Sequence, residues 1–234
     1  MLKKIVKILF LLSIIVNTNM GLADILVVPI FVNFLPNQLP VQNVMVVNRS
    51  DSNAYINVTS YLVEHPGTKL EKKVHFHDPS KLGLLVSPSK LIIPPRQHRM
   101  LRIMQLSKHL TKDKIYRVVV APVPNALIPV GPKAVHDHRI GIRVLVAYGI
   151  LVTARPEHIN RNLVIQRHGK TLLIENKGNT NVVVTGGQQC ANQHCFNLPR
   201  RRMYVGNRWQ VKLPFNKPIS IATDCLGKQQ HIKV

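Results

Sequence analysis

The chain has 234 residues, and 45% of them are hydrophobic, which is enough to build folded cores and excludes a disordered chain. Its formal net charge is +22 at pH 7, so anionic partners are favoured, although charge carries no information about fold. Only 5% of the residues are aromatic, and no stacking ladder, helix-turn-helix or zinc-finger pattern accompanies the basic residues, so nucleic-acid binding is not expected.

The first 23 residues have the three parts of a secretory signal peptide. Three lysines precede an apolar run from 8 to 16, and Gly21-Leu22-Ala23 fits the small-x-small pattern of a cleavage site. The run is shorter than the roughly 20 apolar residues that span a membrane. We therefore expect cleavage near Ala23, export of the mature chain and no stable membrane insertion.

From Asp24 onward, short apolar runs alternate with turn residues. Residues 54–63 alternate polar and apolar side chains, and this period of two is typical of a half-buried strand. Several such runs with turns between them predict an antiparallel β-sandwich. The expected strands lie at 25–29, 44–48, 54–63, 84–86, 90–93, 100–105 and 115–121.

The middle of the chain predicts a long loop, a strand and a hinge. Residues 122–138 contain four prolines and show no period, whereas residues 140–152 return to an apolar strand pattern. Ala154-Arg155-Pro156 should end this strand, because proline lacks a backbone donor and holds the preceding residue extended. We place a hinge at 154–156, between a first domain of residues 24–153 and a smaller β domain of residues 157–234. No internal repeat relates the two domains.

The strand expected at 140–152 is apolar on both faces. Periodicity alone favours a central strand that the core covers on both sides. The alternative is an edge strand with an exposed apolar row, which is an aggregation hazard unless a partner covers it. Such an edge is also what strand addition needs, since main-chain hydrogen bonds give affinity and alternate side chains enter the partner's groove. One face of the strand would carry Ile140, Ile142, Val144 and Val146.

Three cysteines follow the leader, and an exported chain can oxidise them. Cys190 and Cys195 close a small loop between two apolar runs, so a disulfide that staples a hairpin is the first interpretation. Cys225 is then the odd thiol, although the sequence does not settle the pairing. A zinc site at Cys190, His194 and Cys195 is the weaker alternative, because a second ligand pair at the usual spacing is missing.

No catalytic motif is present in the sequence. Neither a Gly-x-Ser-x-Gly elbow, a phosphate-binding loop nor a dinucleotide fingerprint occurs. The ten acidic residues are scattered singly, which does not favour a pair of catalytic carboxylates. The histidine pairs His75/His77 and His136/His138 lie in polar regions without a further ligand. We expect neither an enzyme nor a bound metal or cofactor.

Taken in order, several motifs resemble the periplasmic chaperones of the pilus chaperone–usher pathway. The run Asp24–Pro29 looks like the first strand of that family, and the hinge follows the strand from Ile140 as it does there. The Asn-x-Gly-Asn turn at 176–179 resembles a turn of the family's second domain. Further matches are Val46-Val47-Asn48, Pro88, Pro94, Arg102, Tyr116-Arg117, Pro122-Val123-Pro124, Leu198-Pro199, Arg202-Met203-Tyr204, Gly206-Asn207-Arg208-Trp209 and Leu213-Pro214.

The resemblance implies an all-β protein with two immunoglobulin-like β-sandwich domains, set at an angle with a cleft between them. It implies a periplasmic chaperone, with no catalytic role and no cofactor, that caps pilus or fimbrial subunits by donating a β-strand. The capped subunit would then pass to an outer-membrane usher. The subunit-binding strand would be the row Ile140, Ile142, Val144 and Val146. The resemblance also implies that the chaperone can self-associate when no subunit is bound.

One departure from the family concerns the anchor for the subunit's C-terminal carboxylate. Members of the family use an arginine on the first strand and a lysine on the donor strand. Here residues 24–39 contain neither lysine nor arginine, and Leu151 stands where the lysine is expected. A guanidinium suits a carboxylate because it can bind both oxygens, so Arg143 and Arg155 are the candidate anchors.

The runner-up interpretation is an exported basic β-sandwich protein. Its positive charge would bind anionic envelope or surface polymers, and added salt would weaken that binding steeply.

Overall fold

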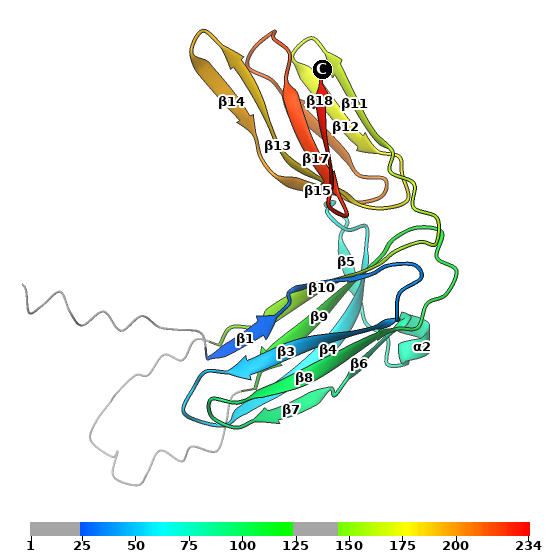
Figure 1. Ribbon diagram of the computed structural model, residues 1–234, viewed down its shortest axis with the longest axis vertical. Coiled ribbons are helices and arrows are strands. Elements are labelled where there is room, and N and C mark those ends of the chain that lie inside the picture. Colours follow the sequence, from blue (N-terminus) through cyan, green and yellow to red (C-terminus); the bar gives the residue numbers. More distant parts are fainter. Residues whose placement is uncertain (1–23, 124–144) are drawn as a thin grey trace, which may run out of the picture.

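The structure is a computed structural model that describes residues 24–123 and 145–234 (Figure 1). These residues form two β-sandwiches set at an angle, which confirms the expected fold class. The one helix that the described residues form is α2 (Pro79–Leu82), a single turn that Asp78 caps. Within the same ranges, no helix has the length and apolar character needed to cross a membrane.

The first sandwich consists of two sheets. One sheet has the order β1-β3-β8-β6 and the other the order β2-β10-β9-β4-β5, with β7 paired to β4. The strands are β1 (Ile25–Val28), β2 (Phe31–Phe34), β3 (Val41–Asn48), β4 (Ala54–Glu64), β5 (Lys72–Val74), β6 (Leu84–Ser87), β7 (Lys90–Ile93), β8 (His98–Gln105), β9 (Lys114–Pro122) and β10 (Tyr148–Ala154).

Alternating side chains build the core of this sandwich. Val44 and Val46 on β3 point inward with Leu101 and Ile103 on β8, and all four are fully buried. The facing sheet contributes every second residue in the same way, such as Val118 and Val120 on β9. Each buried aliphatic side chain stabilises the fold by about 1.5–3 kcal/mol, so the core accounts for much of the stability of the sandwich.

The second sandwich is smaller. Its sheets have the orders β11-β12-β16 and β14-β13-β17-β18, with β15 paired to β13. Leu172, Ile174, Val184 and Met203 are among the residues of its core. The strands are β11 (Leu163–His168), β12 (Thr171–Asn176), β13 (Val182–Ala191), β14 (His194–Leu198), β15 (Arg201–Met203), β16 (Arg208–Lys212), β17 (Ser220–Cys225) and β18 (Lys228–Lys233).

The first strand crosses from one sheet to the other, which the sequence pattern did not predict. β1 pairs with β3, whereas β2 runs parallel to β10 in the opposite sheet. Pro29 lies between the two strands, and a proline cannot donate to the β-ladder. The crossing places β2 at the edge of the sheet that contains β10.

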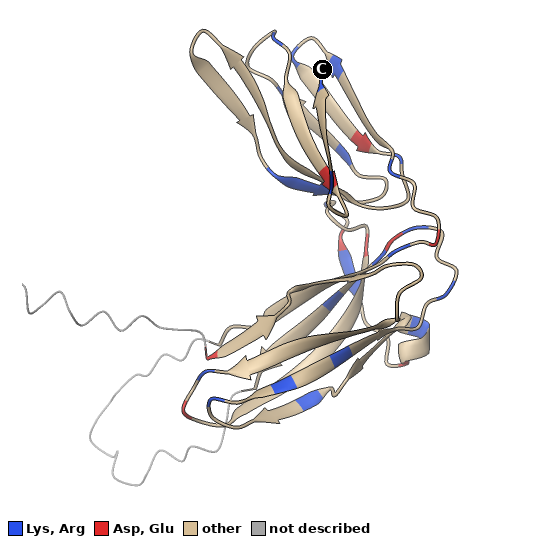
Figure 2. Ribbon diagram, in the orientation of Figure 1, with Lys and Arg blue, Asp and Glu red and all other residues tan. Residues whose placement is uncertain are grey.

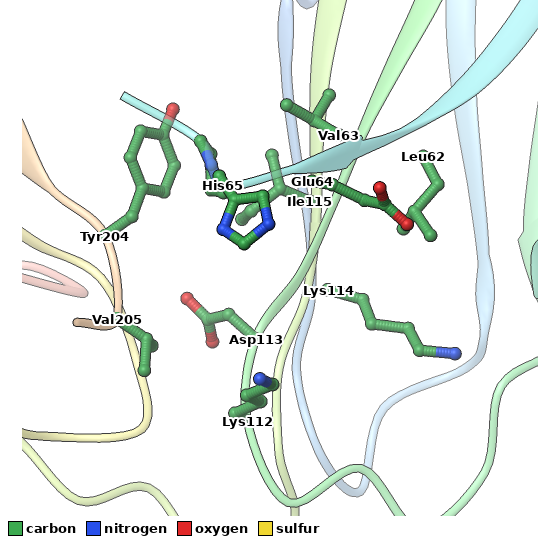
Figure 3. A pocket seen from close by; sticks show the side chains of 11 residues that line it. Leu62, Val63, Glu64, His65, Lys112, Asp113, Lys114, Ile115, Tyr204 and Val205 are labelled. Carbon is green, nitrogen blue, oxygen red and sulfur yellow. The ribbon is translucent and has the colours of Figure 1, made fainter. Parts of the chain in front are cut away.

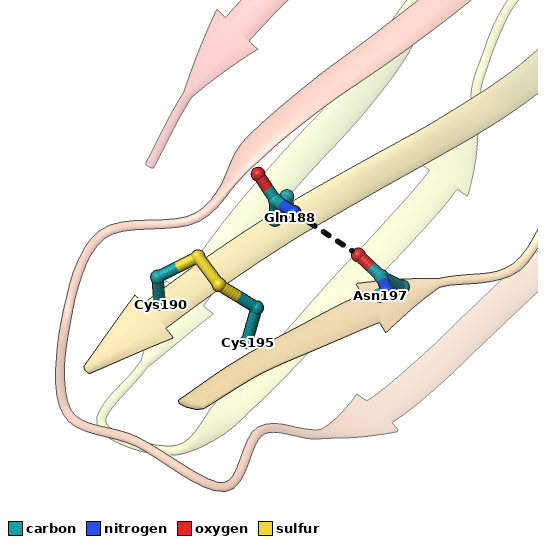
Figure 4. Close-up of a disulfide and its surroundings, with 4 residues drawn as sticks. All are labelled: Gln188, Cys190, Cys195 and Asn197. Atoms are coloured by element: carbon teal, nitrogen blue, oxygen red, sulfur yellow. Dashed lines mark hydrogen bonds between the residues drawn. A yellow bond between two sulfur atoms is a disulfide. The ribbon is translucent and has the colours of Figure 1, made fainter. Parts of the chain in front are cut away.

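β13 is the longest strand of the second domain and is irregular. β13 continues past Gly186-Gly187 to Ala191, with a bulge between Val184 and Gly186. Glycine at a bulge permits the irregular backbone that lets a strand continue beyond it. Figure 4 shows the disulfide between Cys190 and Cys195, which joins β13 to β14. Both thiols are therefore occupied, and no thiolate remains there for the zinc site considered from the sequence.

Candidate functional site

The edge of β10 is only partly covered. β9 pairs with β10 along its whole length, from Tyr148 to Ala154, whereas β2 pairs only with Leu151 to Ala154. The Leu151 amide donates to the Ile30 carbonyl over 2.9 Å. Because backbone groups alternate along a strand, Gly149 presents its own amide and carbonyl on the same side, ahead of the β2 pairing. Within the described residues, the start of β10 is therefore an open edge.

Exposed apolar side chains surround this open edge. Phe31 is 56% exposed and Ile30 44% exposed, at the point where β2 begins. Val146 is 48% exposed and Leu145 37% exposed, in the segment that leads into β10. An open ladder beside apolar side chains is the combination that strand addition by a partner requires.

The predicted donor residues lie at and before this edge. Val146 is exposed and not in a strand, as are Leu145 and Ala147, so β10 begins at Tyr148, inside the run expected at 140–152, and extends to Ala154. The pairing with β9 begins at Tyr148, opposite Val120, and this sets the start of the strand. Ile140, Ile142, Val144 and Arg143 lie outside the described residues.

Arg155 lies in a buried network at the junction of the two domains. Its Nη1 donates to Asp113 Oδ2 over 3.0 Å and also to Thr180 Oγ1, and its Nη2 donates to Asn33 Oδ1 over 3.1 Å. The side chains of Arg155 and Asp113 are only 3% and 2% exposed. Burial lowers the pKa of Arg155, and the charge of Asp113 opposes this effect. Both Nη groups are committed to the junction, which is not the arrangement of a free carboxylate anchor.

Asp113 joins the second domain to the first through one oxygen. Its Oδ2 accepts from the Asn181 amide over 2.8 Å and from Asn181 Nδ2 over 2.6 Å, in addition to Arg155. The Asp113 amide donates to the Asn179 carbonyl over 2.9 Å. A buried charge with several hydrogen bonds is costly to break, so this network fixes how the two sandwiches meet.

A pocket of about 420 Å³ opens beside this network (Figure 3). Figure 3 shows Asp113 between Lys112 and the ring of His65. On one side Tyr204 packs against Val63, Ile115 and Leu151, which carries an aromatic side chain of the second domain onto the outer face of the first. Burial raises the pKa of Tyr204, and the positive charges of Arg202 and Arg117 oppose this effect.

Sequence reasoning missed the residues that line the junction. Asp113 is a single acidic residue in a polar stretch, and Arg202 lies far along the chain in a basic run. Their contacts depend on how the domains meet, and no local pattern encodes that. The signal that could have helped was the composition of the Asn176–Asn181 turn, whose amides are unusually dense.

The sequence is similar to two proteins from Escherichia coli that are both named as fimbrial subunits. It is 28% identical to the CFA/I fimbrial protein over 210 residues, which covers 88% of this chain and 85% of that protein. It is 25% identical to the CS1 fimbrial protein over 177 residues, covering 75% of this chain and 69% of that protein. A comparison with models of protein families finds no match.

Solved structures resemble the whole described architecture. The crystal structure of the class 5 fimbriae chaperone CfaA covers 90% of this chain, and this chain covers 97% of it, with a TM-score of 0.67 at 23% identity. The chain has the fold of the pilus chaperones. The chaperone–tip adhesin complex of the archaic Csu pili of Acinetobacter baumannii supplies a more distant match, with a TM-score of 0.59 at 14% identity over 90% of this chain and 98% of that one. The proteins that share this pilus-chaperone fold are named as chaperones, and not as enzymes.

Proposed function

We propose that this protein is a periplasmic chaperone that binds fimbrial subunits and lends them a β-strand. The observation that carries the proposal is the open start of β10, flanked by exposed Phe31 and Val146, in a protein with the pilus-chaperone fold. The similarity to E. coli fimbrial proteins supports the same role. The leader at residues 1–23 supports export to the periplasm.

The donated strand would be formed by the row Ile140, Ile142, Val144 and Val146. On binding, the segment would extend β10 and pair with the subunit along the open edge, while the alternate side chains fill the subunit's groove. Burying each of these side chains is worth about 1.5–3 kcal/mol, which offsets the cost of ordering the segment. A capped subunit has no free edge, so it would not polymerise before an outer-membrane usher accepts it.

The two candidate anchors for the subunit's carboxylate now differ. Arg155 spends both of its Nη groups on Asp113, Thr180 and Asn33, so it is a poor anchor. Arg143 stays a candidate as part of the donor segment. Neither arginine occupies the position of Leu151, where a lysine was expected.

Co-expression tests this function. The protein would be produced in the periplasm together with the fimbrial subunit encoded next to its gene, and the complex recovered through a tag on the chaperone. We expect a one-to-one complex that survives dilution. Replacing both Ile142 and Val144 with Asp should abolish it, since two charges would enter an apolar groove.

A matched control is Ile92→Asp. Ile92 is 60% exposed on β7, away from the β10 edge. The Ile92→Asp variant therefore adds a charge to the same domain without touching the proposed strand. The control should bind like the unaltered protein. If Ile142→Asp with Val144→Asp still yields the complex, strand donation through this segment is wrong.

The high net charge keeps a second function open, in which the protein binds anionic envelope or surface polymers. Lysines and arginines are spread over both domains in Figure 2. This function predicts retention on a heparin column that added salt removes steeply, in the donor-strand variant as well as in the unaltered protein. It would also predict no stable complex with the fimbrial protein.

A further inference from the structure

His75 and His77 follow β5, and their side chains lie on the same side of the chain. Phe76, the residue between them, packs against the core of the first sandwich, whereas both histidines are exposed. Successive side chains of an extended segment point to opposite sides, so the inward Phe76 directs its two neighbours outward together. The two imidazole rings are in contact, with centroids 5.0 Å apart and planes at 82° to each other.

The backbone is held on both sides of this histidine pair. Before it, β5 pairs with β4 from Leu62 to Glu64. After it, Asp78 caps α2, where its Oδ1 accepts from the Ser80 amide over 2.8 Å, and Leu82 of the same turn is buried. Two ligands on a held backbone lose less conformational entropy on binding than two ligands on a free loop.

A hydrogen bond of His75 determines which of its ring nitrogens is available to a ligand. His75 Nδ1 lies 3.1 Å from the Ser60 carbonyl oxygen. A carbonyl can only accept, so Nδ1 carries the proton, and in the neutral ring Nε2 then has the lone pair. Histidines that bind metals are typically oriented in this way, by an acceptor that holds the other ring nitrogen. The ring of Tyr61, with its centroid 5.5 Å away, packs against the same imidazole.

The separation of the two histidine rings matches that of two imidazoles on one metal ion. With metal–nitrogen bonds of about 2.0–2.1 Å in a tetrahedral site, two such ring centroids lie roughly 5 Å apart. The observed separation is 5.0 Å. His77 is exposed, so its ring can turn to direct a nitrogen at the same ion. We propose that His75 and His77 together chelate a divalent transition-metal ion through their imidazole nitrogens.

The two ligands define the class of metal. Imidazole nitrogens suit copper, nickel and zinc, whereas magnesium and calcium prefer oxygen ligands. Among the divalent ions of the first row, copper binds a given nitrogen site most tightly. Within residues 24–123 and 145–234, no three side chains of His, Cys, Asp or Glu gather as a metal-binding group. The ion therefore keeps coordination positions for water or for a ligand from another molecule.

The site lies on the far side of the sheet from the open edge of β10. The sheet has the order β2-β10-β9-β4-β5, so β9 and β4 separate β10 from β5, which leads into the histidine pair. Metal binding and strand addition thus use different parts of the first domain. This inference does not rest on the proposed function, and failure of either one leaves the other standing.

A titration with Cu²⁺ tests the site. The protein, produced without a polyhistidine tag, is titrated by calorimetry, and electron paramagnetic resonance detects the nitrogens bound to the copper. His136 and His138 have the same spacing but lie outside the described residues, so both are replaced by Ala throughout. Because chelation needs both rings, His75→Ala and His77→Ala should each weaken the tightest Cu²⁺ binding by roughly 10-fold or more, and the double variant should weaken it little further.

The matched control is His98→Ala combined with His168→Ala. Both are exposed histidines, and they lie on β8 and β11 in different domains, so this variant removes two imidazoles that are not neighbours. The control should bind Cu²⁺ like the protein in which these histidines are kept. Zn²⁺ should compete for the site, whereas an excess of Mg²⁺ should not. Circular dichroism reports whether each variant is folded.

Two results would overturn the site. If His75→Ala and His77→Ala leave the tightest Cu²⁺ binding unchanged, the two imidazoles do not chelate an ion. If the control weakens Cu²⁺ binding as much as the double variant of His75 and His77 does, copper binds to exposed histidines in general, and the pair has no special role.

Discussion

The same hydrogen-bonded turn occurs once in each domain, after β3 and after β12. In the first, Asn48 Nδ2 donates to the Ser52 carbonyl over 2.7 Å and to the Ile93 carbonyl over 2.9 Å, and Asn48 Oδ1 accepts from the Ser50 amide. In the second, Asn176 makes the corresponding bonds to the Thr180 and Met203 carbonyls, over 2.8 and 2.9 Å, and to the Gly178 amide. Both asparagines are buried, so each domain uses one amide to tie a turn to the far side of its sandwich.

The surroundings of the two turns differ. The turn after Asn48 faces solvent and carries the exposed ion pair between Asp51 and Arg96. The turn after Asn176 docks on the first domain, where Asn179 Nδ2 donates to the Thr111 carbonyl over 3.0 Å and Thr180 accepts from Arg155. The comparison teaches that one rigid turn can either face solvent or form an interface, depending on its exposed side chains and not on its backbone.

The last strands of the two domains differ in a similar way. β18 is the edge strand of its sheet, and exposed polar side chains cover it, including Lys228 and Lys233. Charges on an edge prevent other strands from pairing with it. β10 has instead apolar Leu145 and Val146 at its start. The second domain thus closes its edge to partners, whereas the first leaves part of its edge open.

The largest effect should come from the ion pair at the docked turn. Asp113→Ala leaves Arg155 buried without its counter-charge, and breaking a buried pair in this way typically costs about 3–5 kcal/mol. We expect a loss of this size in the free energy of unfolding, measured by urea denaturation and followed by Trp209 fluorescence and circular dichroism.

The exposed pair supplies the control. Asp51→Ala removes an acid from the equivalent turn of the first domain, where both side chains are mostly exposed, and it should cost between about 0 and 1 kcal/mol. Equal losses for Asp113→Ala and Asp51→Ala would contradict the view that docking, and not the turn, makes the difference.

The next largest losses in the free energy of unfolding should come from replacing the two buried asparagines. Asn48→Ala and Asn176→Ala each leave buried backbone carbonyls without a donor, and each should cost about 2–3 kcal/mol. The similar losses should appear in different domains. Only Asn176→Ala should shift the Trp209 fluorescence transition strongly, because Trp209 lies on β16 of the second domain. If Asn48→Ala also shifts the Trp209 transition, the two domains unfold as one unit and this expectation is wrong.

Asn179→Ala should have a smaller effect that is confined to the junction. Asn179 Nδ2 also donates to the His158 carbonyl over 2.7 Å, and Asn179 Oδ1 accepts from the Asn160 amide, so the side chain holds the connecting segment as well as the first domain. We expect a loss of about 1–2 kcal/mol. Limited proteolysis between residues 155 and 162 should speed up in this variant and stay unchanged in Asp51→Ala.

The sequence predicted the strands whose apolar residues alternate, and it failed where contacts are non-local. Residues 54–63 were predicted as a strand because one sandwich face is buried there, and β4 covers them. The crossing of the first strand into the second sheet could not be predicted, since β2 is held by pairing with β10, more than a hundred residues later. The helix α2 is too short to show a helical period.

The candidate site likewise has one part that the sequence predicted and another part that it did not. The apolar row that ends at Val146 was visible in the sequence because strand alternation is local. The role of Arg155 was not, because its partners Asp113 and Thr180 come from two other parts of the chain. No repeat was visible either, although the two domains share the asparagine turn, because a single buried amide and its backbone carbonyls leave almost no trace in composition.

The smallest effect concerns two tyrosines, one in the first core and one at the junction. Burial raises the pKa of both Tyr116 and Tyr204, so each phenol stays neutral in the folded protein to higher pH than in the unfolded chain. The stability that this provides is complete below the ordinary phenol pKa of about 10 and is lost as the pH rises through the folded value. Tyr116→Phe and Tyr204→Phe should therefore each change how the free energy of unfolding varies between about pH 9 and pH 11, measured by urea denaturation at both pH values. If both variants keep the pH dependence of the unaltered protein, burial of these phenols is not its cause.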